Sequence, residues 1–160
     1  MAAQPAIVAF DGSDEARAAV RAAATLFSGH PLIVVSVWEA GLAQVMAPLR
    51  DPTGMSYAAI PASPEEAAAI DRIQHDHAIQ AADDGVRLAR ELGATAEPYP
   101  VADEADVAVT IASLADERDA CAVVVGTRGL GGIKARLLGS TSRELLRRTN
   151  RPVLVVKAPE

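Results

Sequence analysis

The sequence predicts a doubly wound α/β fold, in which helices cover both faces of a five-stranded parallel sheet. Short apolar runs alternate along the chain with longer segments of helical period, a pattern typical of parallel sheets buried between helices. Half of the 160 residues are apolar, enough for one sizeable core, and only 3% are aromatic. We therefore expect residues 1–160 to form a single domain whose core is filled by alanine, valine and leucine.

The expected strands and helices alternate along the chain. The strands are the apolar runs at residues 7–10, 32–38, 95–101, 122–125 and 153–156. A first helix begins after Ser13, which suits an N-cap, and apolar residues then recur at helical spacing as far as Phe27. The remaining helices are expected at residues 70–92, 108–115 and about 141–149.

Residues 41–66 interrupt this alternation. They contain Pro48, Pro52, Pro61 and Pro64, and they follow the second expected strand. We interpret them as a long mobile loop within the domain, and not as a domain boundary, because the strands on either side are needed for one sheet.

A glycine-rich segment in the C-terminal part of the chain is the strongest indication of function. Gly126 and Gly129 are separated by two residues, and Gly139-Ser140 follows after nine more. The segment joins an apolar strand to a helix, so its amides and the start of that helix favour an anion. It matches neither the Walker A loop nor the complete dinucleotide fingerprint. The segment therefore predicts phosphate binding, with an ordinary turn as the alternative.

A second strand-to-helix corner lies near the start of the chain. Asp11 and Gly12 follow the first strand, directly before the expected N-cap Ser13. In open parallel sheets, ligands bind beyond the carboxyl ends of the strands, where the strand order reverses. The corner at Asp11 is thus a second candidate for one side of a binding crevice.

The two corners together resemble those of the universal stress protein family, and the resemblance covers nearly the whole chain. It is carried by Asp11-Gly12-Ser13, by the spacing of Gly126, Gly129 and Gly139-Ser140, and by the closing strand Arg151-Pro-Val-Leu-Val-Val156. It implies a Rossmann-like, adenine nucleotide alpha hydrolase-like sheet of order 3-2-1-4-5, with the crevice between strands one and four. One residue departs from the family pattern, because Cys121 stands where an aspartate usually opens strand four.

The resemblance also implies an ATP-binding protein, with magnesium held mainly through the phosphate oxygens. It assigns the nucleoside to Asp11 with the backbone around Ala9 and Phe10, and adenine to Val37. The residues that it places on the ribose and phosphate side are Val125, Gly126, Arg128, Gly129, Gly139, Ser140, Thr141 and Ser142.

Several of these assignments have a structural alternative that needs no ligand. Asp11 suits an Asx turn, Val37 suits the core, and Thr141 with Glu144 fits a capping box. The matched spacing of the two corners favours the nucleotide site over these separate explanations.

Charge is distributed unevenly along the chain. The formal net charge is −6 and the pI is near 5.1, which argues against nucleic acids and membrane surfaces as partners. The basic residues around the glycine-rich segment are Arg128, Lys134, Arg136, Arg143, Arg147, Arg148 and Arg151. This local excess favours an anionic ligand, although a solvated helix face is the better explanation for Arg147 and Arg148.

No catalytic or metal-binding cluster is recognisable in the sequence. His75 and His77 are two residues apart on a helix, so they cannot chelate one metal from one face. The lone Cys121 opens an apolar strand, where we expect a buried, inert thiol. With neither a leader pattern nor a membrane-length apolar run, we expect a cytoplasmic protein.

The final strand is apolar and lies at an edge of the implied sheet, where unpaired amides invite a second copy of the chain. We expect a homodimer through residues 152–157, and the alternative is an edge covered by the C-terminal tail. The resulting hypothesis is an ATP-binding regulator of the stress response. A slow ATPase, a protein that binds AMP or cyclic AMP, and a nucleotide-free dimeric scaffold remain alternatives.

Overall fold

The computed structural model describes residues 3–41, 63–103, 106–127 and 138–159. Its elements are β1 (Ala6–Ala9), α1 (Asp14–Leu26), β2 (Leu32–Glu39), α3 (Pro64–Glu91), β3 (Ala96–Asp103), α4 (Val107–Glu117), β4 (Ala122–Gly126), α5 (Ser140–Arg148) and β5 (Val153–Val156). All neighbouring strands are parallel, and their order is β3-β2-β1-β4-β5. The predicted fold class and strand order are therefore confirmed.

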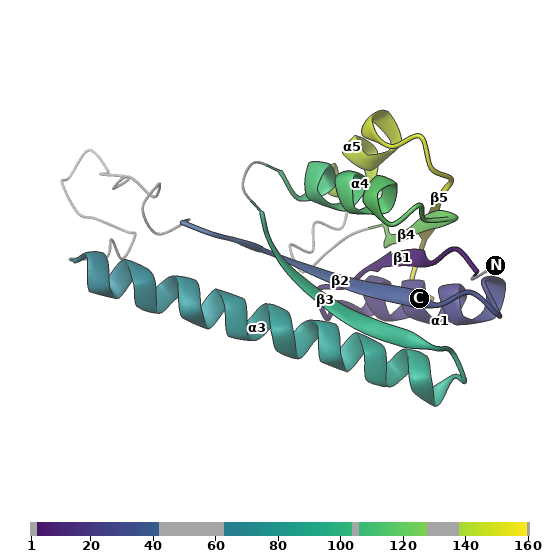
Figure 1. Ribbon diagram of the computed structural model, residues 1–160, viewed down its shortest axis with the longest axis horizontal. Helices are drawn as coiled ribbons and strands as arrows, with labels where there is room; N and C mark the ends of the chain where they lie inside the picture. Colours follow the sequence, from purple (N-terminus) through teal and green to yellow (C-terminus); the bar gives the residue numbers. More distant parts are fainter. Residues whose placement is uncertain (1–2, 42–62, 104–105, 128–137, 160) are drawn as a thin grey trace.

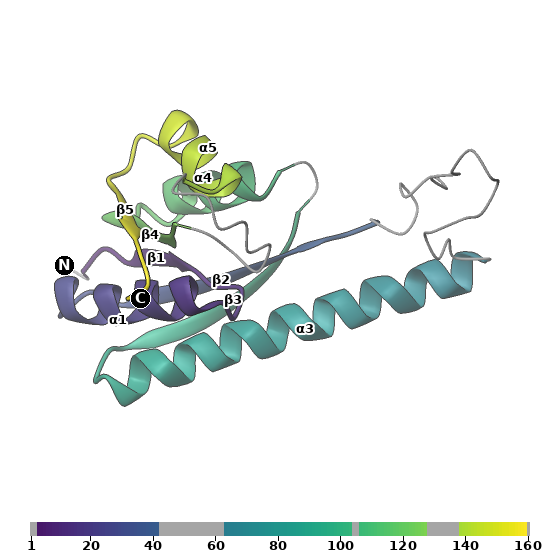
Figure 2. The same ribbon diagram turned by 180° about the vertical axis from the view of Figure 1, so that it is seen from behind.

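Helices cover both faces of the sheet. Helices α1 and α3 lie on one face and α4 and α5 on the other, as the two opposite views show (Figure 1, Figure 2). Because side chains alternate along a strand, Val8 and Phe10 pack with α1 and α3, whereas Ile7 and Ala9 face α4 and α5. The central strands are buried on both faces, which explains why they are continuous apolar runs in the sequence.

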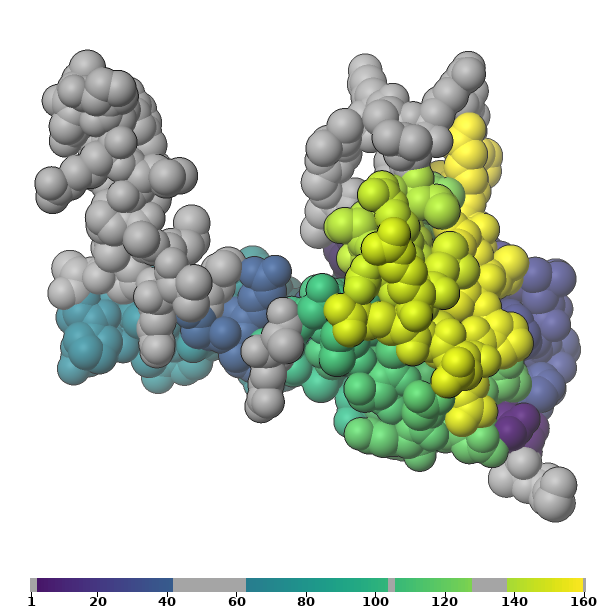
Figure 3. All heavy atoms as spheres, turned by 90° about the horizontal axis from the view of Figure 1, so that it is seen from above, coloured from purple at the N-terminus to yellow at the C-terminus, as the bar shows by residue number. Residues whose placement is uncertain are grey.

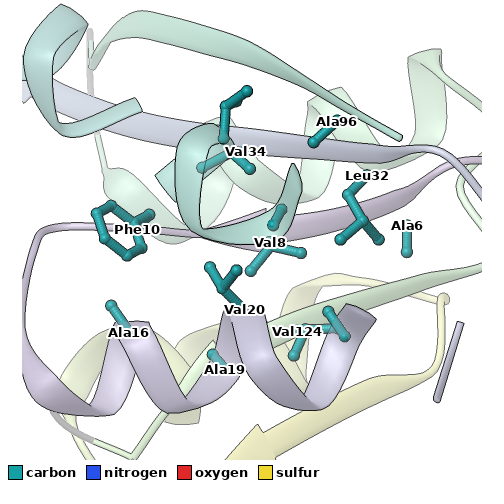
Figure 4. Packing of buried hydrophobic residues seen from close by; sticks show 13 residues of the cluster. Ala6, Val8, Phe10, Ala16, Ala19, Val20, Leu32, Val34, Ala96 and Val124 are labelled. Atoms are coloured by element: carbon teal, nitrogen blue, oxygen red, sulfur yellow. The ribbon is translucent and has the colours of Figure 1, made fainter. Parts of the chain in front are cut away.

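Small side chains bring α3 close to the sheet. Figure 4 shows Val8, Val20 and Val34 directed into the cluster between the sheet and these helices. Gly85 of α3 lies directly over this cluster, because a Cβ added at Gly85 would stand 2.7 Å from Val34 Cγ1 and 3.0 Å from the Phe10 ring. The alanine- and valine-rich composition thus permits the close helix-to-sheet packing.

Helix α3 begins earlier than the sequence analysis expects. Ser63 caps it by accepting a hydrogen bond from the Glu66 amide, and Pro64 occupies the first turn, where its missing N–H costs nothing. Residues 64–66, predicted as the end of a loop, are therefore helical, and residues 42–62 lie outside the described part of the chain. The N-terminal end of α3 projects beyond the main body (Figure 3).

Arg151 joins the start of β5 to the end of α4. Its guanidinium donates to Asp116 Oδ1 at 3.0 Å, to Asp119 Oδ1 at 2.8 Å and to the Ala120 carbonyl at 3.2 Å. Asp119 has a left-handed backbone with φ of 47°, and its second carboxylate oxygen accepts from Gln4. The hydrogen bonds from Arg151 and then from Gln4 lower the pKa of Asp119 below its ordinary value.

We expect this carboxylate to make the stability of the protein depend on acid pH. Because the folded pKa is lowered, its contribution is present above the unfolded pKa of about 4 and is lost as the pH falls through the folded pKa. Asparagine tolerates the left-handed backbone. Asp119→Asn should therefore reduce the pH dependence of the free energy of unfolding, measured with urea, below about pH 4. Equal slopes in the wild type and in Asp119→Asn would contradict the assignment.

Candidate functional site

A cleft of about 630 Å³, its open mouth included, lies at the carboxyl ends of β1, β2 and β4. The predicted site residues that line it are Ala9, Phe10, Asp11, Val37, Val125, Gly126, Gly139, Thr141 and Ser142. Ser140 is exposed at the start of α5 and is not part of the lining, and Arg128 and Gly129 lie outside the described residues.

One wall of the cleft is apolar. Val35 and Val37 of β2 form it together with Val107 and Ile111 from the first half of α4. Val35 and Ile111 are almost fully buried, whereas Val37 and Val107 are only partly covered. Such a wall suits a flat apolar group, such as an aromatic ring. The contribution of α4 was missed in the sequence analysis, which identified this segment only as a helix.

The opposite end of the cleft is the N-terminus of α5. The N-cap is Gly139, and no side chain accepts a hydrogen bond from the first amides. In contrast, Ser13 caps α1, Ser63 caps α3 and Asp106 caps α4. Of the helices described, α5 alone therefore presents an uncapped positive end, which favours an anion.

A backbone hydrogen bond sets the position of this helix start. The Gly139 amide donates to the Thr127 carbonyl at 2.7 Å, and the Thr127 amide donates to the Val156 carbonyl at 2.8 Å. These bonds hold the end of β4 between the end of β5 and the start of α5. They bring the two ends of the glycine-rich segment together, as the prediction of one anion cradle requires.

The Asp11 side chain stabilises the local turn, with or without a ligand in the cleft. Its Oδ1 accepts a hydrogen bond from the Ser13 amide at 3.0 Å, which is the Asx turn left open as an alternative. Ser13 then accepts from the Ala16 amide at 3.2 Å and begins α1, as predicted. The exposed Asp11 side chain also borders the cleft, so the turn places a carboxylate at its mouth.

Two details at the start of α5 differ from the sequence analysis. The capping box of Thr141 and Glu144 does not form, because the helix begins one residue earlier and Glu144 pairs with Arg148 at 2.7 Å. The Ser142 hydroxyl donates back to the Gly139 carbonyl at 3.2 Å, so its proton is not directed to a ligand. Ser142 is left with its backbone amide as a donor to an anion.

Gly126 is required by the packing of α1 and not only by the cleft. An added Cβ would lie 2.6 Å from Glu15 Cβ and 2.9 Å from its carbonyl carbon. Cβ atoms essentially never approach so closely, and the backbone of α1 cannot yield without moving the helix. The packing of α1 is therefore sufficient to require a glycine here, and the expectation that Gly126 also leaves room for a phosphate stays a prediction.

The described basic residues near α5 interact within the protein. Arg147 and Arg148 pair with Glu144, and Arg143 donates to the Leu138 carbonyl. These contacts support the solvated-face interpretation of Arg147 and Arg148. Arg128, Lys134 and Arg136 fall outside the described residues, so the remaining part of the predicted basic cluster has no structural description here.

Cys121 and His30 lie at the opposite end of β4. His30 Nδ1 is 2.8 Å from the Gln4 carbonyl oxygen and 3.6 Å from Cys121 Sγ. Cys121 is only partly buried and not fully buried as expected. Burial still raises the pKa of its thiol, which favours the protonated form. Within the described residues there is neither a group of three potential metal ligands nor a helix long and apolar enough to cross a membrane.

Comparison with known proteins gives a consistent result. The universal stress protein family model matches residues 3–157. A universal stress protein of Mycobacterium tuberculosis is 36% identical over 86 residues, which are 53% of this chain and 29% of that protein. The chain thus spans less than a third of the length of this curated relative.

Solved structures extend the comparison to the whole chain. The universal stress protein from Archaeoglobus fulgidus in complex with dAMP is 26% identical, with a TM-score of 0.64 over 98% of this chain and 100% of that one. A universal stress protein in complex with cAMP is also 26% identical, with a TM-score of 0.62 over 99% and 100% of the two chains. Fold, motif spacing and family match agree, and the chain belongs to the universal stress protein family.

Proposed function

We propose that this protein binds an adenine nucleotide in the cleft, with the base on the apolar wall and the phosphates at the start of α5. The observation that carries the proposal is the uncapped N-terminus of α5 facing a wall of Val35, Val37, Val107 and Ile111. An apolar surface and a group of free amides are the two features that a nucleotide needs. The relatives that are solved with dAMP and cAMP support the same ligand class.

We further propose that the physiological ligand is ATP, with magnesium carried by its phosphate oxygens. The cleft is open at its mouth, which leaves space for additional phosphates. Asp11 borders the same cleft and is assigned to the nucleoside. The protein would then act as a cytoplasmic, single-domain regulator of the stress response that signals through its nucleotide state.

Native mass spectrometry of the purified protein tests this proposal. A mass increment equal to an adenine nucleotide is expected, and denaturation should release the nucleotide for identification by chromatography. A phosphate-release assay with ATP then separates a binding protein from a slow ATPase, since only the enzyme gives sustained release. A folded sample that neither retains nor takes up any adenine nucleotide would contradict the proposal.

We also propose that the protein forms a homodimer through β5. The carbonyl of Pro152 accepts a hydrogen bond from the Val123 amide, and the carbonyl of Val156 accepts one from the Thr127 amide. Because alternate residues of a strand direct their backbone groups to opposite sides, the N–H and C=O groups of Val153 and Val155 point to the open edge. A second copy of the strand can pair with these groups, because strand edges with unpaired amides accept further strands.

The other edge of the sheet is protected against such pairing. The Thr95 carbonyl accepts a hydrogen bond from the Leu32 amide of β2. The backbone N–H and C=O positions of the even-numbered residues of β3 therefore point away from β2, and two of these residues are Pro98 and Pro100. Proline has no N–H to offer a further strand. The outward carbonyl of Ala96 is occupied by Arg90, which donates to it at 2.9 Å. The contrast between the two edges favours β5 as the dimer interface.

Val155→Pro is expected to convert the dimer to a monomer. The substitution removes an outward N–H at the proposed interface and leaves the hydrogen bonds between β5 and β4 in place. Size-exclusion chromatography with light scattering measures the mass. Ala102→Pro is the matched control, because it places proline at an outward position of β3 and should leave the mass unchanged. A dimeric Val155→Pro variant, or a monomeric wild type, would rule out this interface.

A further inference from the structure

The N-terminal half of α3 lies outside the main core of the protein. The buried α3 residues that belong to the cluster shared with α1 are Val86 and Ala89, near the C-terminal end of the helix. The N-terminal half instead runs alongside the end of β2 and projects beyond the main body (Figure 1, Figure 3). It therefore meets β2 at the point where that strand borders the cleft.

The end of β2 receives less support from the sheet than the rest of the strand. Strand β1 pairs with β2 only as far as Val35, whereas β3 continues beside β2 to Glu39. Among the described strands, β3 alone is therefore paired with Val37, which forms part of the apolar wall of the cleft. A segment paired on one edge opens more readily than a strand that is paired on both.

Two contacts from α3 hold this segment from the side opposite to the cleft. Because side chains alternate along a strand, Val37 faces the cleft and Trp38 faces α3. The Trp38 and His75 rings meet edge to face, with their centroids 5.5 Å apart. Just beyond the strand, the Gly41 amide donates to Asp71 Oδ1 at 3.1 Å. Asp71 and His75 are four residues apart, so they share one face of the helix.

We propose that His75 and Asp71 are positioning residues of the nucleotide site, which fix the base-binding wall by bracing the end of β2 from behind. Neither residue is part of the cleft lining, and both act on Val37 through Trp38 and Gly41. The inference rests on the proposed nucleotide function and adds to it a role for the projecting half of α3. A wall that is fixed before the ligand arrives loses less freedom on binding, so the brace raises affinity.

His75→Ala tests the inference by removing the ring contact. Trp38 is the only tryptophan of the chain, so its fluorescence reports directly on the end of β2. The emission of the ligand-free variant should move to longer wavelength, because the indole loses a neighbour and becomes more hydrated. Calorimetric titration should show affinity for adenosine and for ATP reduced equally, by about 3- to 10-fold, since an edge-to-face pair is lost and the base is common to both ligands.

Conservative variants separate positioning from a general loss of structure. His75→Phe keeps a ring against Trp38 and should bind ATP like the wild type. Asp71→Asn keeps an oxygen that can accept from the Gly41 amide, so it should retain most of the affinity. Asp71→Ala removes this acceptor and should weaken ATP binding by a factor similar to that of His75→Ala.

His77→Ala is the matched control, because it removes an exposed histidine that lies about 200° further round the same helix. It should change neither the emission of Trp38 nor the affinity for ATP. Wild-type affinity in His75→Ala would overturn the inference, as would a reduced affinity without a shift in emission, or a His75→Phe variant as weak as His75→Ala. A wild-type protein that binds neither adenosine nor ATP would instead overturn the proposed function, and the inference with it.

Discussion

Leu145→Ala is expected to destabilise the protein by about 2–5 kcal/mol and to abolish nucleotide binding. Leu145 is completely buried and belongs to the core beneath α4 and α5. It is the buried apolar side chain of α5, where Ser142 is the other buried residue. Removing it leaves a cavity and takes away the contact that holds the uncapped helix start at the cleft. Urea unfolding measures the first effect, and calorimetric titration with ATP measures the second.

Leu146→Ala provides the matched control for this experiment. Leu146 follows Leu145 in the same helix and is also a leucine, but it is 51% exposed. The substitution should change the free energy of unfolding by less than about 0.5 kcal/mol, as is usual at the surface. Equal losses in the two variants would mean that α5 is not anchored by Leu145.

Gly126→Ala is expected to destabilise the protein by about 1–3 kcal/mol and to weaken nucleotide binding strongly. The added Cβ would lie 2.6 Å from Glu15 Cβ and 2.9 Å from the Glu15 backbone, so α1 must move away from the end of β4. Because Asp11 at the entry to α1 and Gly126 both border the cleft, this movement would change its shape. Thermal unfolding and ligand titration of the same samples would record both losses.

A double-mutant cycle with Glu15→Gly separates this collision from other effects. The second substitution removes the closest atom, Glu15 Cβ, and leaves the backbone contact in place. The double variant should therefore lose less stability than the sum of the two single variants. Strictly additive losses would show that the Cβ of Glu15 is not the atom that Gly126 accommodates.

Much of the fold could be predicted from the sequence because the strands are buried on both faces. Runs such as 122–125 must then be apolar throughout, and they contrast clearly with the helical spacing between them. The start of α1 was also predictable, since Ser13 caps it through its own side chain. The boundary at Pro64 was missed because a proline was interpreted as a loop residue, although the first turn of a helix accepts it.

The candidate site was less accessible to sequence reasoning. Spacing identifies the glycines but does not show where a missing Cβ would point, and at Gly126 it points to Glu15 of α1. Ser142 was placed on the phosphate side, yet its hydroxyl bonds to the carbonyl of the N-cap Gly139. The contact between Trp38 and His75 depends on packing between segments that are distant in sequence. A local pattern contains none of this information.

The central claim is that the cleft between the apolar wall and α5 binds an adenine nucleotide. Isothermal titration calorimetry of the nucleotide-free protein with ATP and magnesium tests it most directly. We predict saturable heat with one site per chain, which Leu145→Ala removes and Leu146→Ala retains. The absence of saturable heat at millimolar ATP, in a sample whose cooperative unfolding shows that it is folded, would contradict the claim.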